Sequence, residues 1–130
     1  MNSFTRERAA ITILFITIAI AGYLLSGCAG FTKDAYRSLA VSQQTYDTAL
    51  SVMGDLYKEG KVTVEQKDKA IQLGRAYKTA HNTAISALAF YEEVGTDQSK
   101  QAYLTAATNA ARLLSELMGY VQPLIEKGGK

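Results

Sequence analysis

The sequence predicts an all-α fold in which three helices, joined by short turns, form an up-down-up bundle. Residues that break helices are scarce, because the 130-residue chain holds one proline and ten glycines. Two of those glycines, Gly60 and Gly95, divide the chain beyond residue 31 into three segments. Each segment carries apolar residues at alternating spacings of three and four, which is the repeat of an amphipathic helix. The length leaves room for one domain.

The first helix is expected over residues 32–59. Thr32 is a suitable cap for its start, and Asp34 in the first turn interacts favourably with the helix dipole. Gly60 is a natural stop, because glycine readily adopts the left-handed conformation that ends many helices. The apolar row, in which Gln43 holds one place, consists of Tyr36, Leu39, Tyr46, Leu50, Met53 and Tyr57.

The second helix is expected over residues 64–94, and both of its ends are well marked. Thr63 and Gln66 have the spacing of a capping box, in which each side chain bonds the backbone N–H of the other residue. Gly95 ends the helix. Its expected core face consists of Leu73, Tyr77, Ala80, Ala84, Leu88 and Tyr91.

The third helix is expected over residues 97–121. Pro123 removes a backbone hydrogen bond, so the helix should end or kink near residues 118–120. The bundle would then extend to residue 125, with residues 126–130 as a frayed tail. The apolar row of this helix consists of Tyr103, Ala107, Ala110, Leu114, Leu117, Val121 and Leu124.

The same spacing of apolar residues fits two architectures. One is a monomeric bundle, and the other is an oligomeric coiled coil to which each chain contributes hairpins. The monomeric bundle is favoured, because all three segments carry an apolar face and can cover one another.

The N-terminal segment has the layout of a secretory signal. Residues 1–8 are polar and include two arginines, and they precede an apolar run over residues 11–25. No charged residue occurs between Ala9 and Thr32, a stretch long enough to cross a bilayer. An uncleaved transmembrane anchor is therefore the alternative to a cleaved signal peptide.

The apolar run ends in Leu25-Ser26-Gly27-Cys28, which resembles the lipobox of bacterial lipoproteins. The resemblance implies a signal peptide over residues 1–27, cut between Gly27 and Cys28 by a peptidase that recognises Leu25, Ser26 and Gly27. It also implies that Cys28 carries a diacylglyceryl thioether and an N-acyl chain such as palmitate. Residues 28–31 would then form a short tether.

The resemblance covers roughly the first 30 residues and also implies a location. Several acyl chains together anchor a protein stably to a membrane. In Gram-negative lipoproteins the residue after the cysteine influences sorting, and Ala29 points to the periplasmic face of the outer membrane. No family is recognised for the helical segments that follow.

The remaining composition argues against enzymes, metal sites and nucleic-acid binding. One His and one Cys exclude a disulfide within the chain and the usual zinc sites. The formal net charge of +2 comes without a basic stripe, so no nucleic-acid partner is expected. His81 is expected to be a partly exposed helical residue, and Glu92-Glu93 a solvated helix end. No cofactor is expected besides the lipid.

Seven tyrosines lie beyond residue 28, and they permit two interpretations. They can line the core with their hydroxyls at its margin, which is favoured, or they can form a partner-binding stripe. The best interpretation of the whole chain is a membrane-anchored, non-enzymatic interaction or structural module with a protein partner in the cell envelope. One alternative is a homo-oligomeric coiled-coil component of an envelope or phage-encoded complex. Another is a helical bundle that binds a small ligand.

Overall fold

The computed structural model describes residues 28–128, and this part of the chain consists of helices joined by two short turns. It contains helices α2 (Cys28–Lys58), α3 (Val64–Val94) and α4 (Asp97–Gly128). For this part of the chain, the prediction of an all-α fold with three helices is confirmed. Residues 34–130 form one compact unit, and the packing below is that of its described part.

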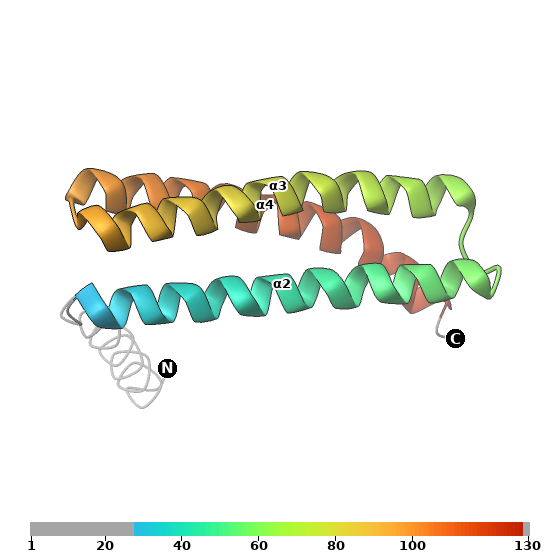
Figure 1. Ribbon diagram of the computed structural model, residues 1–130. Coiled ribbons are helices and arrows are strands. Elements are labelled where there is room, and N and C mark those ends of the chain that lie inside the picture. Colours follow the sequence, from blue (N-terminus) through green and yellow to red (C-terminus); the bar gives the residue numbers. More distant parts are fainter. Residues whose placement is uncertain (1–27, 129–130) are drawn as a thin grey trace, which may run out of the picture. The chain divides into compact units, whose positions relative to one another are not determined.

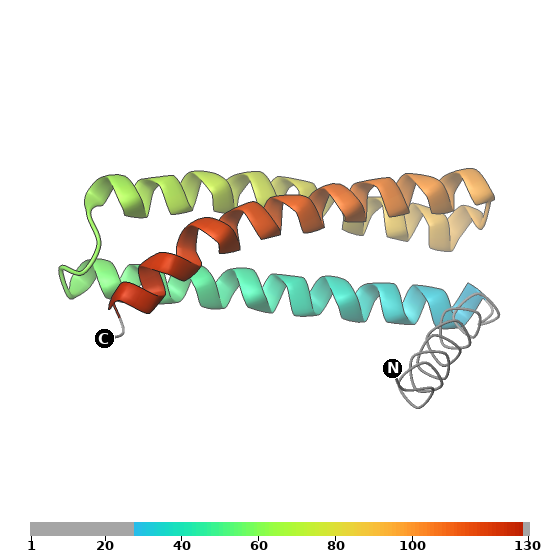
Figure 2. The ribbon, with the colours of Figure 1, turned by 180° about the vertical axis from the view of Figure 1, so that it is seen from behind.

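Successive helices run in opposite directions, as expected of a three-helix bundle (Figure 1). The hydroxyl of Tyr36, near the start of α2, lies 3.2 Å from a carboxylate oxygen of Glu92, near the end of α3. At the other end, the Lys67 ammonium lies 4.4 Å from the centre of the Tyr57 ring. Figure 2 shows that α4 runs beside the end of α3 at first and that its last turns lie close to the end of α2.

Two glycine stops and one capping box fix the turns, as the sequence predicts. At Gly60, where φ is 71°, the N–H groups of Gly60 and Lys61 donate to the carbonyls of Tyr57 and Leu56. This is the Schellman arrangement, which satisfies carbonyl groups at a helix end. At the start of α3, Thr63 and Gln66 make both hydrogen bonds of the capping box.

The start of α4 has a cap that sequence reasoning missed. The hydroxyl of Thr96 accepts from the N–H of Ser99 at 3.1 Å, and the hydroxyl of Ser99 accepts from the N–H of Thr96 at 3.1 Å. The pair works as a capping box in which serine takes the place of Glu or Gln. Ser99 is only 3% exposed, although residues 95–98 of the turn are exposed.

Two helix ends differ from the prediction. Helix α2 begins at Cys28 and not at Thr32, so the expected tether is helical and Thr32 does not cap the helix. Helix α4 does not end near residue 121 but continues through Pro123 to Gly128. Proline costs one backbone hydrogen bond, which tertiary packing of the last turns compensates. A Cβ added at Gly128 would lie 2.6 Å from Leu56 Cδ2, which shows how closely this end of α4 packs on α2.

The core is continuous along the three helices but uneven in character. Where α2 and α4 end and α3 begins, it is aliphatic, and Met53, Leu117 and Val121 are 1% exposed or less. In the middle of the bundle it is built around Tyr77, which packs with Ala80 and Ala110. Tyr77 belongs to this second cluster, and the buried His81 side chain lies beside it.

Candidate lipidation site and partner surfaces

Cys28, the residue expected to carry the lipid, is the first residue of α2. Ala29, the expected sorting residue, follows it within the same helix. Leu25, Ser26 and Gly27, with the rest of the expected signal peptide, lie outside the described residues. From residue 28 to residue 128, no helix combines the length and apolar character needed to cross a membrane.

His81 is buried, which corrects the expectation of a partly exposed residue. It is 4% exposed, and its Nε2 lies 3.0 Å from the backbone carbonyl oxygen of Leu39 on α2. A carbonyl only accepts, so the imidazole holds a hydrogen on Nε2 and donates it across the α2–α3 interface. Its Nδ1 is buried and has no hydrogen-bond partner in the part of the chain that the structure describes. His81 therefore joins two helices and is closed to substrates.

Tyr77 is the second buried polar residue of this region. Its ring centre lies 5.4 Å from that of His81 and 5.1 Å from that of Tyr46, and the residue is fully buried. Its hydroxyl, like His81 Nδ1, has no hydrogen-bond partner among residues 28–128. Burial raises the pKa of Tyr77 to about 12, while the nearby Ser42 hydroxyl acts in the opposite direction. The expectation that the core tyrosines keep their hydroxyls at the margin is wrong at this position.

The other tyrosines divide between core and surface. Tyr91 and Tyr103 are each 5% exposed, whereas Tyr36 and Tyr57 are 36% and 38% exposed. Burial raises the pKa of Tyr103. The tyrosines thus form no single stripe, and the exposed pair lies at opposite ends of α2.

Glu92 and Glu93 are both exposed, and they have different surroundings. Glu92 accepts a hydrogen bond from Tyr36, whose pKa is raised by burial and, to a lesser degree, by this bond and the carboxylate charge. No hydrogen bond or ion pair of Glu93 occurs among the described residues. The two carboxylates do not act as a pair. Within the same range, no cluster of three His, Cys, Asp or Glu side chains could hold a metal ion.

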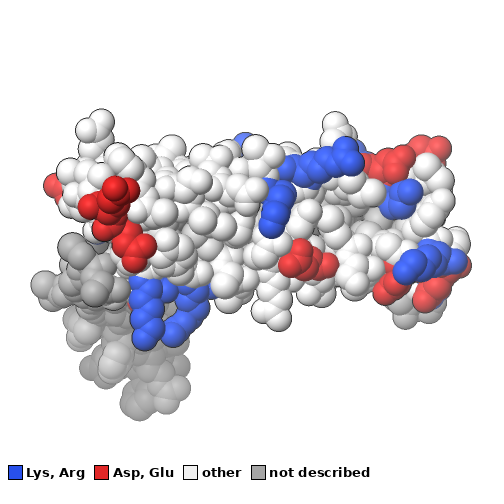
Figure 3. Space-filling model, in the orientation of Figure 1, with Lys and Arg blue, Asp and Glu red and all other residues white. Residues whose placement is uncertain are grey.

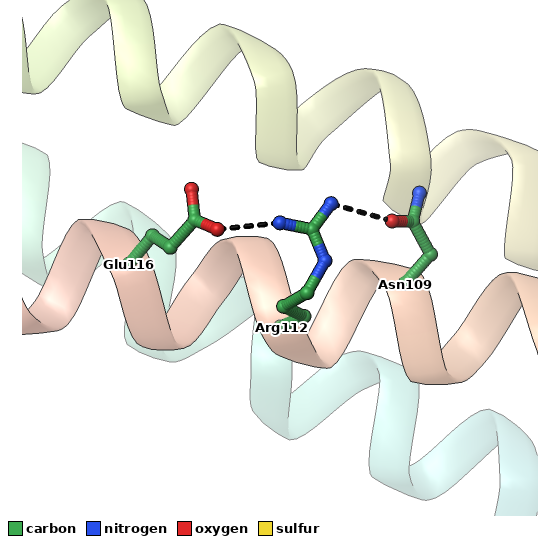
Figure 4. A network of polar contacts seen from close by, with 3 residues as sticks. All are labelled: Asn109, Arg112 and Glu116. Atoms are coloured by element: carbon green, nitrogen blue, oxygen red, sulfur yellow. Dashed lines mark hydrogen bonds and ion pairs between the residues drawn. The ribbon is translucent and has the colours of Figure 1, made fainter.

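A polar network lies on the surface of α4 (Figure 4). The guanidinium of Arg112 donates to a carboxylate oxygen of Glu116 one turn ahead and to the amide oxygen of Asn109, 2.9 Å away. Both ion-pair partners are about half exposed, so the pair adds little stability. Its effect is to hold the guanidinium along the helix. The shallow surface beside it is lined by Gln101, Leu104, Thr105, Thr108, Asn109 and Arg112.

A shallow groove of about 380 Å³ lies between α3 and α4. Most of its lining side chains are small, so the two helix backbones leave a trough that is not filled by this chain. The lining residues are Ala76, Thr79, Ala80, Thr83, Ala106, Asn109 and Leu113. Sequence periodicity placed Ala80 on the core face of the second helix and did not identify an open groove beside it.

Side chains of both charge signs are spread along the face of the bundle that Figure 3 shows. Acidic side chains lie at the end that holds the α3–α4 turn, and basic side chains lie near them over the start of α2. Further basic side chains lie over the middle of α3, and both signs of charge occur at the opposite end of the bundle. No family model, no curated protein and no solved structure matches this chain.

Proposed function

We propose that this chain is a bacterial lipoprotein, anchored through lipid on Cys28, whose helical domain is a non-enzymatic interaction or structural module of the cell envelope. The observation that carries this proposal is Leu25-Ser26-Gly27-Cys28 at the end of the apolar run. Small residues before the cysteine suit the narrow pocket of the signal peptidase, and the cysteine is the only one in the chain.

The position of Cys28 in the fold supports the proposal. A cut before Cys28 leaves α2, α3 and α4 whole, because α2 begins at that residue. The mature domain would then be an up-down-up bundle with the lipid on its first helical residue. Each acyl chain adds about 0.8 kcal/mol of membrane affinity per buried methylene, so several chains anchor without a membrane-spanning helix.

The character of the domain favours binding over catalysis. His81 and the Tyr77 hydroxyl are enclosed in the core, where no substrate reaches them. Exposed apolar residues and the groove between α3 and α4 offer surfaces for a protein partner. With Ala29 after the cysteine, we place the protein at the periplasmic face of the outer membrane in a Gram-negative host.

Intact mass spectrometry of protein extracted from membranes tests the proposal. The wild type should begin at Cys28 and carry a diacylglyceryl group and an N-acyl chain, while Cys28→Ser should keep Met1 and gain no lipid. Ser26→Ala is the matched control, because it keeps a small residue before the cut and should be processed like the wild type. A wild type with Met1 and an unmodified thiol would refute the proposal in favour of a transmembrane anchor.

A further inference from the structure

One face of α3 carries the exposed side chain of Phe90 and also borders the groove between α3 and α4. Ala76, Thr83 and Phe90 are spaced by seven residues, so they lie on nearly the same face of α3. Ala76 and Thr83 line the groove, whereas Phe90 is 54% exposed. Val94, one turn beyond Phe90, is 45% exposed. One face of a single helix thus offers both a projection and a trough of small residues.

We propose that this face binds a second copy of the same chain, with the two α3 helices antiparallel. In such a pair the Phe90 ring of each copy occupies the groove of the other and packs on Ala80. Phe90 and Ala80 are about 15 Å apart along α3, at 1.5 Å per residue. A symmetric interface requires a surface that is complementary to itself, and a projection and a trough on one helix meet that requirement.

Two charged residues of α3, Arg75 and Glu93, also favour the antiparallel pairing. Arg75 and Glu93 are exposed, and neither has an ion-pair partner among residues 28–128. They are separated by five helical turns, so they lie along one edge of the face. In an antiparallel pair, Arg75 of each copy meets Glu93 of the other.

The groove and the two charged residues are compatible with one position of the two-fold axis. Seating Phe90 on Ala80 puts the axis at the level of Ile85, and pairing Arg75 with Glu93 puts it at the level of Ala84. These levels differ by about 1.5 Å along the helix. A parallel pair would instead bring Phe90 onto Phe90 and leave both charges without partners.

This inference does not rest on lipidation, and its test uses the full-length chain with Cys28→Ser in detergent so that each introduced cysteine is the only thiol. Thr83→Cys lies near the axis and should cross-link to itself with a short bismaleimide. Thr48→Cys, exposed on α2 and away from the groove, is the control for random collisions. Equal yields at the two positions would overturn the proposal and leave the groove to a different partner.

The direction of pairing is tested with two further variants. Ala76→Cys and Val94→Cys should cross-link when mixed, and neither should cross-link alone. Self-cross-linking of each variant alone, with no mixed product, would show a parallel pair and contradict the antiparallel arrangement.

Charge exchange provides a separate measurement. In the Thr83→Cys chain, Arg75→Glu or Glu93→Arg should each weaken association about fivefold, because two symmetry-related pairs are lost together. The double exchange restores opposite charges and should recover the original association. If association were weakened as much in the double variant as in the single variants, the pairing of Arg75 with Glu93 would be ruled out.

Discussion

Removing the buried Tyr77 hydroxyl, which has no hydrogen-bond partner among residues 28–128, should stabilise the fold, whereas most core substitutions destabilise it. Tyr77→Phe keeps the ring, which packs at 5.1 Å from the Tyr46 ring, and removes only the buried oxygen. A buried polar group without a partner costs about 1 to 3 kcal/mol. We therefore expect the variant to be more stable than the wild type by about 1 kcal/mol, the lower end of that range. In a domain of roughly 100 residues this raises the melting temperature by about 4 to 8 °C.

The assay is thermal unfolding of the chain shortened to residues 29–130, followed by circular dichroism. Tyr46→Phe is the matched control, because the same oxygen is removed from a residue that is only partly buried. Its melting temperature should stay within a few degrees of the wild type. A lower melting temperature for Tyr77→Phe, with Tyr46→Phe unchanged, would refute the reasoning. It would mean that the hydroxyl has a partner, for which the neighbouring Ser42 is the first candidate.

The same hydroxyl predicts a loss of stability in alkaline solution. Burial chiefly raises the pKa of Tyr77 from 10.0 to about 12, so between these values the unfolded chain ionises and the folded chain does not. Below pH 10 the ionisation of Tyr77 leaves the free energy of unfolding unchanged. As the pH rises from 10 towards 12, the free energy of unfolding falls, because the unfolded chain loses this proton first. The stability gap between Tyr77→Phe and the wild type should therefore widen above pH 10. A constant gap would show that Tyr77 ionises equally in both states.

Two further substitutions test the core and the cap. Leu117→Ala, at a fully buried position, should lower the free energy of unfolding by about 2 to 5 kcal/mol in urea titrations, while Val41→Ala at a 57% exposed position changes it little. Equal effects of these two would mean that this face of α4 does not contact the core. Thr63→Ala removes the hydroxyl that accepts from Gln66 and should cost about 1 kcal/mol, and an unchanged urea midpoint would show that water replaces the cap.

Local chemistry explains why the turns and the number of helices could be predicted. The reciprocal bonds of Thr63 and Gln66 involve residues three apart, so their spacing in the sequence is sufficient to mark the start of α3. The positive φ angles of Gly60 and Gly95 are likewise a property of single residues. The candidate lipidation site belongs to the same class, since four consecutive residues carry it.

The sequence by itself determined the helical class, the positions of both turns and the candidate lipid attachment at Cys28. Only the tertiary structure decided which polar groups are enclosed and which surfaces stay open. His81 is buried because the Leu39 carbonyl of another helix accepts its hydrogen, and α4 passes Pro123 because its last turn packs on Leu56. The groove between α3 and α4 and the exposed Phe90 depend on how each helix is rotated about its axis. That rotation is set by side chains distant in sequence, so periodicity alone does not reveal it.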